Sequence, residues 1–143
     1  MRFAKWAVVP FVLIAVACGS NTPCRTCPPI DGTYSVRWDT DGGVNMSCPG
    51  PRVPQWVFTQ RDSQITTTIA AVPLGGTLYD SYDLLLTGTQ TGLNYRLRSL
   101  VIPEGTSDDA GMRLQGTFTT RTVADGGDTC ESNEGFTAQR TSR

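Results

Sequence analysis

Apolar and polar residues alternate with a period of two along most of this chain, and that alternation constrains the fold more than any other feature. In residues 32–38, for example, Tyr34, Val36 and Trp38 fall on one face. Period-two alternation rich in Thr, Tyr and Val is the signal of half-buried β-strands. After the first twenty residues, no long stretch shows the i, i+3, i+4 stripe of an amphipathic helix. The chain is therefore predicted to be all-β.

About eight such runs follow one another, and segments rich in Gly, Asp and Ser separate them. The predicted inward residues are, run by run, Tyr34, Val36 and Trp38; Trp56 and Phe58; Ile65, Thr67, Ile69 and Ala71; Leu78; Tyr82, Leu84 and Leu86; Leu93, Tyr95, Leu97 and Val101; Met112, Leu114, Gly116 and Phe118; Phe136 and Ala138. Turns are predicted at residues 39–43, 61–63, 74–76, 90–92 and 125–128. Short links favour antiparallel hairpins, so the sequence predicts an up-and-down barrel or a sandwich of about eight antiparallel strands.

The start of the chain has the pattern of an export signal. Arg2 and Lys5 supply positive charge, and an apolar run over residues 6–16 is interrupted only by Pro10. This run is too short to cross a bilayer, which takes about 20 apolar residues. The sequence therefore predicts a cleaved signal peptide over residues 1–17, a tether over residues 18–31 and a β-domain over residues 32–143.

The end of this signal, Ala15-Val16-Ala17-Cys18, resembles the lipobox of bacterial lipoproteins, although Ala15 stands where Leu is commonest. The resemblance implies cleavage before Cys18, acylation of its sulfur and a lipid anchor in the cell envelope. Under the sorting rule of that family, Gly19 in place of Asp favours the outer membrane over the inner one. The alternative is ordinary secretion with a free thiol, because Ala15 and Ala17 also satisfy the A-x-A rule.

The chain has five cysteines, and lipidation of Cys18 leaves Cys24, Cys27, Cys48 and Cys130 for two disulfides in an oxidising compartment. Cys24 and Cys27 have the C-x-x-C spacing of redox motifs and of half a zinc site. The adjacent prolines indicate an extended segment, and no second close pair exists to complete a zinc site. We therefore predict a structural Cys24–Cys27 disulfide and a Cys48–Cys130 bridge, with Cys130 in a long loop between the last two strands.

The residue types limit the chemistry. The chain has no histidine, which excludes Ser–His–Asp and Cys–His catalysis and removes the commonest metal ligand. Residues 39–43 resemble the start of a calcium loop, but the other ligands are not at the required spacing, so a plain turn is predicted. Without Arg2 and Lys5, ten basic residues face thirteen acidic ones, a net charge of −3 with no basic stretch. We predict no nucleic-acid partner, no cofactor, no metal and no catalytic residue.

The Gly-x-aromatic opening at Gly32 and Tyr34 resembles calycin-like barrels, the lipocalin group among them. Those barrels are eight-stranded and often enclose an apolar ligand, but Tyr34 replaces the signature Trp of that family, so the ligand function is not carried over. The sequence predicts a non-enzymatic binding or interaction module on the envelope, with a small apolar ligand or a protein as its possible partner. The alternative is a hydrolytic enzyme with paired carboxylates, which two carboxylates in one pocket would favour.

Overall fold

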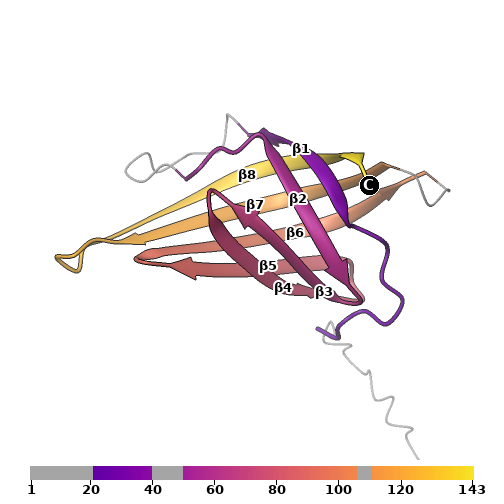
Figure 1. The fold of residues 1–143 in the computed structure, drawn as a ribbon, viewed down its shortest axis with the longest axis horizontal. Coiled ribbons are helices and arrows are strands. Elements are labelled where there is room, and N and C mark those ends of the chain that lie inside the picture. The colour runs from indigo at the N-terminus through magenta and orange to yellow at the C-terminus, as the bar shows by residue number, and fades with distance from the viewer. Residues whose placement is uncertain (1–20, 40–49, 106–110) are drawn as a thin grey trace, which may run out of the picture.

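The computed structural model describes residues 21–39, 50–105 and 111–143, which form eight strands in one closed barrel (Figure 1). The strands are β1 (Gly32–Trp38), β2 (Gln55–Arg61), β3 (Gln64–Ile69), β4 (Val72–Leu78), β5 (Asp83–Gln90), β6 (Leu93–Glu104), β7 (Gly111–Val123) and β8 (Thr129–Ser142). Each strand pairs antiparallel with the next, and β8 returns to β1. That last pairing decides between the two predicted architectures in favour of the barrel. In the described ranges, no helix is long and apolar enough to cross a bilayer.

The inward faces of the strands fill the barrel with side chains. Five aromatic residues that the alternation predicted to point inwards are at most 2% exposed: Tyr34, Trp56, Phe58, Phe118 and Phe136. The ring centroids of Trp56 and Phe136 are 4.8 Å apart, and those of Tyr34 and Phe58 are 5.2 Å apart, both with edge-on geometry. Edge-to-face contacts of this kind are favourable between aromatic rings. The interior is thus a packed core, as is usual for a barrel of this strand number.

Two residues predicted to point inwards lie on the surface instead. Tyr82 is 45% exposed in the β4–β5 turn, and Ala71 is exposed in the β3–β4 turn. Their φ angles are +63° and +66°, so both residues take the left-handed conformation of tight turns. A positive φ breaks the strand alternation, which explains why extending the period into the turn gave the wrong face.

The turn predicted at residues 74–76 is also wrong, because these residues lie in the middle of β4. The buried positions of this strand are Val72, Leu74 and Leu78. A Cβ atom on Gly76 would collide with the backbone of Leu85 on β5. Glycine here therefore serves the close approach of two strands rather than a change of direction.

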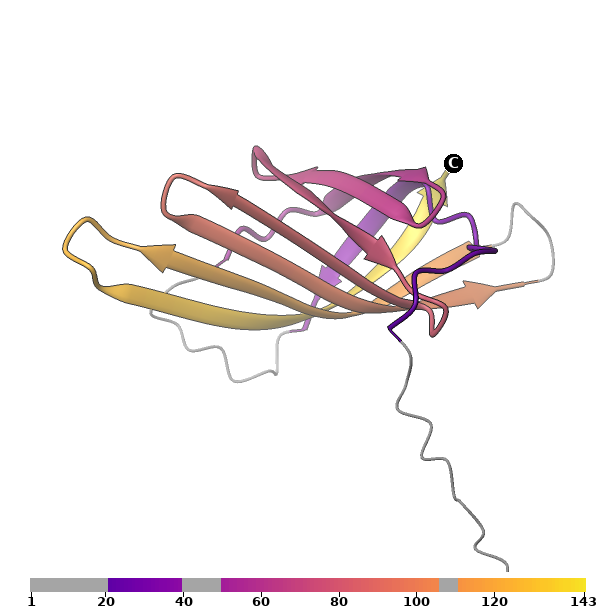
Figure 2. The ribbon, with the colours of Figure 1, turned by 90° about the horizontal axis from the view of Figure 1, so that it is seen from below.

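The hairpin formed by β7 and β8 projects beyond the rest of the barrel, as two views show (Figures 1 and 2). Its register runs from Arg113 opposite Gln139 to Val123 opposite Thr129, which confirms the turn predicted at residues 125–128. Cys130 lies in β8, opposite Thr122 of β7. The prediction that Cys130 lies in a long loop is therefore wrong, because β8 begins earlier than the sequence indicated.

The two ends of the barrel differ in what they carry. We call the end with the β3–β4, β5–β6 and β7–β8 turns the hairpin end, and the opposite end, where residues 21–31 lie, the tether end (Figure 2). At the tether end Pro23 forms a bridge with Tyr79, and the Cys24 amide donates to the Leu78 carbonyl at 3.0 Å. The chain is thus hydrogen-bonded to the barrel well before β1 begins.

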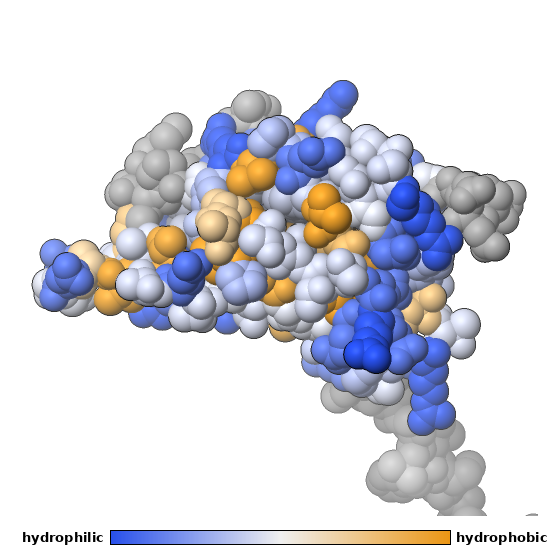
Figure 3. Space-filling view, viewed as in Figure 1, coloured by the Kyte–Doolittle hydropathy of each residue, from blue (hydrophilic) through white to orange (hydrophobic). Residues whose placement is uncertain are grey.

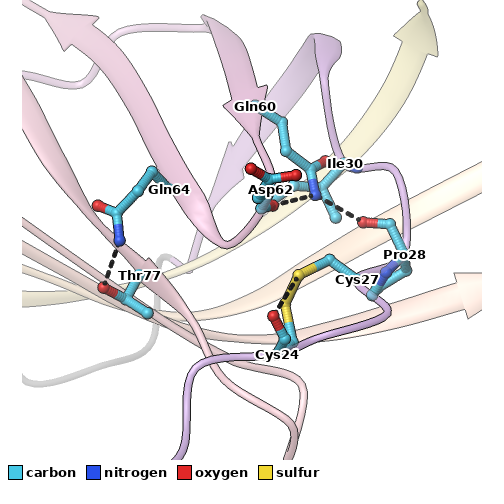
Figure 4. Close-up of a disulfide and its surroundings, with 8 residues drawn as sticks. All are labelled: Cys24, Cys27, Pro28, Ile30, Gln60, Asp62, Gln64 and Thr77. Carbon is cyan, nitrogen blue, oxygen red and sulfur yellow. Dashed lines mark hydrogen bonds between the residues drawn. A yellow bond between two sulfur atoms is a disulfide. The ribbon is translucent and has the colours of Figure 1, made fainter.

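The side chain of Gln60 on β2 holds the second half of this segment (Figure 4). Its Oε1 accepts from the Ile30 amide at 2.7 Å, and its Nε2 donates to the Pro28 carbonyl at 3.1 Å. Ile30 is fully buried, and its carbonyl accepts a hydrogen bond from the Tyr34 hydroxyl at 2.8 Å. Cys24 and residues 27–31 of the segment predicted as a tether are therefore at least partly buried against the domain.

Candidate functional site

The structure contains the Cys24–Cys27 disulfide that the sequence predicted, with 5.3 Å between the Cα atoms (Figure 4). This bond sits in a segment packed on the barrel and is a structural crosslink there. Cys130 is disulfide-bonded as well. Cys18 and Cys48 lie outside the described residues, so acylation of Cys18 and the Cys48–Cys130 pairing stay predictions.

The residues that flank residues 40–49 both lie against the β7–β8 strand pair. The Asp39 amide donates to the Gly135 carbonyl at 2.9 Å. On the other side, a Cβ atom on Gly50 would touch Thr120 Oγ1 and lie 3.4 Å from Glu134 Oε2. The connection from β1 to β2 therefore begins and ends beside the β7–β8 pair. Cys130 lies on β8, so this arrangement favours the predicted Cys48–Cys130 bridge.

Two carboxylates line one cleft at the tether end, the arrangement that would favour a hydrolase. Asp31 and Asp62 share this cleft of about 450 Å³ with Arg25 and Arg143. Arg143 Nε lies 3.3 Å from Asp31 Oδ2, and Asp62 is exposed to solvent. A carboxyl group that acts as a general acid at neutral pH lies in apolar surroundings, and neither Asp31 nor Asp62 does.

No group of three or more metal-ligating side chains occurs among the residues that the structure describes.

A buried carboxylate at the hairpin end was not predicted. Glu134 is 3% exposed, and Arg52 holds its Oε1 with Nε at 3.0 Å and Nη2 at 2.9 Å. Its Oε2, Thr120 Oγ1 and Ser132 Oγ are buried and have no hydrogen-bond partner among the residues that the structure describes. Extending the inward alternation of β8 back from Phe136 would have placed Glu134 and Ser132 inside. Their polarity concealed that signal.

The outer face of the last four strands carries a groove of about 430 Å³, which we call the β5–β8 groove. Its volume lies within the range of small-molecule sites. Its polar lining comes from all four strands and includes Thr89, Asn94, Arg96, Thr119, Arg121 and Asn133. Sequence reasoning placed such residues on the solvent face but did not predict a groove, because its lining comes from four strands that only the closed sheet places side by side.

A second cleft of about 390 Å³ continues the β5–β8 groove towards the tether end. The two share Thr87 and Arg96, and the second extends to Arg98 and to Asn21. Together they form a polar strip along the outer face of β5 and β6, from the hairpin end to the point where the chain enters the domain.

Threonine hydroxyls orient both asparagine side chains of the β5–β8 groove. Thr89 Oγ1 donates to Asn94 Oδ1 at 3.1 Å, and Thr119 Oγ1 donates to Asn133 Oδ1 at 2.6 Å. Each amide oxygen thereby accepts one hydrogen bond, and this orientation directs each amide nitrogen to donate elsewhere. Tyr95 also lines the groove, and burial raises the pKa of its hydroxyl.

The apolar residues on the face of β2 to β5 are scattered among polar ones and form no continuous band (Figure 3). Val57, Tyr82, Leu100 and Val123 are exposed large hydrophobic residues, and they come from different strands and turns. Single exposed hydrophobic residues are normal on a protein surface and mark no docking patch. The recessed polar surface of the β5–β8 groove is therefore the stronger candidate for binding.

No family model, no curated protein and no solved structure matches this chain. The likeness of its first residues to lipoprotein signals, and of its opening strand to calycin-like barrels, rests on the residues that suggested it.

Proposed function

We propose that this protein is a lipid-anchored envelope lipoprotein whose barrel is a non-enzymatic binding module and whose binding surface is the β5–β8 groove. The observation that carries the binding role is that the open space lies on the outside of the barrel and not in its interior. Aromatic side chains fill the barrel interior, while the groove on the outside is open and polar. A ligand therefore binds on the outer face rather than inside the barrel.

The anchor follows from Cys18, and the orientation of the domain follows from Asn21, which lines the second cleft. Cys18 precedes Asn21 by three positions, a length of chain that spans about 10 Å when extended. Acylation at Cys18 thus holds the tether end close to the bilayer and directs the hairpin end away from it. Each buried methylene of an acyl chain contributes about 0.8 kcal/mol, so two or more chains make the attachment permanent. Gly19 directs the protein to the outer membrane.

The hydrolase alternative has less support. It needs one carboxyl group that stays protonated and another that acts as base or nucleophile. Arg143 holds Asp31 in an ion pair, and Asp62 is exposed, so neither carboxyl group of the cleft that they share lies in an apolar environment.

Expression of the full chain in a Gram-negative host tests the anchor, and we predict acylation of Cys18. Intact mass spectrometry of detergent-extracted protein is expected to show a chain that begins at Cys18 with a diacylglycerol-sized addition. The variant Cys18→Ser is expected to leave the membrane fraction or to keep its signal peptide, whereas Ser20→Ala remains anchored. An unmodified chain that begins at Cys18 in the soluble fraction would refute the proposal.

A further inference from the structure

Hydrogen-bond donors dominate the β5–β8 groove. Because threonine hydroxyls occupy the amide oxygens of Asn94 and Asn133, both side chains offer NH₂ groups to a ligand. Arg96 and Arg121 add two guanidinium groups, each with several donors and no acceptor. A ligand that satisfies this lining must be rich in acceptors.

The arginines are also free to meet an anion. Arg96 and Arg121 are exposed, and they lie diagonally across neighbouring strands, because Arg96 pairs with Thr119 and Arg121 with Asn94. In the described part of the chain, neither forms an ion pair. Glu131, opposite Arg121 on β8, contributes one carboxylate at the end of the groove.

The second cleft adds Arg98, and Asp83 contributes a carboxylate there. The polar strip therefore carries three guanidinium groups against these two carboxylates. The planar guanidinium fork matches carboxylate and sulfate groups with two parallel hydrogen bonds.

The groove does not suit a peptide or a nucleic acid. All eight strands are paired in the closed barrel, so the described strands offer no free edge for an added strand. Tyr95 is the aromatic residue of the groove lining and is 5% exposed, and Tyr79, the aromatic residue of the second cleft, is partly buried. Protein interfaces rely on exposed aromatic anchors, and single-stranded nucleic acids stack on aromatic rings, so a buried Tyr95 serves neither partner.

We propose that the β5–β8 groove binds an acidic polysaccharide, a hydrated chain that carries carboxylate or sulfate groups. This inference rests on the proposed binding function and names its ligand class. Amide and hydroxyl groups of the lining meet the sugar hydroxyls, and the arginines meet the acidic groups. The continuity of the groove with the second cleft through Thr87 and Arg96 suits a polymer rather than a single small anion.

Binding of detergent-extracted full-length protein to immobilised glycans tests this inference. The probes are polygalacturonate for carboxylates, heparin for sulfates, dextran as a neutral glycan and polyglutamate as an acidic polymer without sugars. The test variant is Arg96→Gln with Arg121→Gln. The matched control is Arg37→Gln with Arg61→Gln, which removes the same charge from exposed positions on β1 and β2 outside the groove. Equal thermal unfolding of all forms shows that each is folded.

We expect the wild-type protein to bind polygalacturonate, heparin or both, and not dextran. The groove variant is expected to bind at least about tenfold more weakly, which corresponds to the loss of about 1.4 kcal/mol. The control variant is expected to bind like the wild type. Equal loss in both variants, binding to dextran, binding to polyglutamate in preference to both acidic glycans, or no glycan binding would each overturn the inference.

The outcome separates this inference from the proposed function. If Cys18 is acylated and acidic glycans do not bind, the ligand class is wrong and the anchor stands. If Cys18 is unmodified and the soluble protein still binds an acidic glycan through the groove, the ligand class stands and the anchor is wrong.

Discussion

At the scale of the residue, Tyr34 ties the packed N-terminal segment to the barrel. Its hydroxyl donates to the Ile30 carbonyl at 2.8 Å in a fully buried site. We predict that Tyr34→Phe destabilises the fold by about 1–3 kcal/mol, because it leaves a buried carbonyl without its donor. Urea denaturation measures this change. Tyr82→Phe is the control, because the Tyr82 side chain is exposed, and its stability is expected to equal that of the wild type.

The same variant tests the ionisation of this hydroxyl. Burial raises the pKa of Tyr34 far above its usual value, while the nearby Arg140 acts in the opposite direction. A raised pKa in the folded state contributes stability that is complete below the unfolded pKa of about 10 and is lost as the pH rises above it. Above pH 10 the stability of the wild type should therefore fall more steeply than that of Tyr34→Phe. Parallel pH profiles would contradict the assignment.

At the scale of the element, β4 depends on a glycine where the sequence predicted a turn. We predict that Gly76→Ala destabilises the barrel by about 1–3 kcal/mol, because the added methyl group meets the Leu85 backbone and forces β4 and β5 apart. Gly126→Ala is the control, since nothing lies within 4 Å of a Cβ atom at that position. Thermal unfolding of the two variants makes the comparison. Equal melting temperatures would show that β4 and β5 are not closely apposed at Gly76.

At the scale of the whole molecule, we predict that a Cys48–Cys130 bridge matters more for folding than Cys24–Cys27 does. A crosslink that encloses roughly 83 residues removes about 4.5 kcal/mol of loop-closure entropy from the unfolded chain, against about 2 kcal/mol for the four-residue loop. The larger value is a substantial part of the 5–15 kcal/mol net stability typical of a domain. Cys48→Ala with Cys130→Ala should therefore destabilise the protein more than Cys24→Ala with Cys27→Ala.

Peptide mapping under non-reducing conditions checks the pairing itself. A peptide that joins Cys48 to Cys130 is the expected product. A peptide that joins Cys130 to any other cysteine would refute this connectivity, whatever the denaturation curves show.

The sequence by itself determined the all-β class, the presence of about eight strands and the inward face at most positions, with Ala71 and Tyr82 as exceptions. Trp56, Leu97 and Phe136 were assigned to the core from their spacing alone, and all three are buried. Side chains alternate across a strand whatever its partner is, so a local pattern suffices for this prediction. The turn at residues 125–128 was predicted for the same reason, because its Asp and Gly residues favour a reversal locally. The Cys24–Cys27 disulfide was predicted from the export signal, which implies an oxidising compartment, and from the extended segment that holds the pair.

Only the tertiary structure decided which features are brought together from distant parts of the chain. Closure into a barrel depends on pairing between β1 and β8, which lie about a hundred residues apart. Burial of Glu134 depends on Arg52, and packing of the N-terminal segment depends on Gln60. The β5–β8 groove depends on the curvature of four strands. The partners in these contacts cannot be read from a local period in the sequence, because each contact is set by the geometry of the closed sheet.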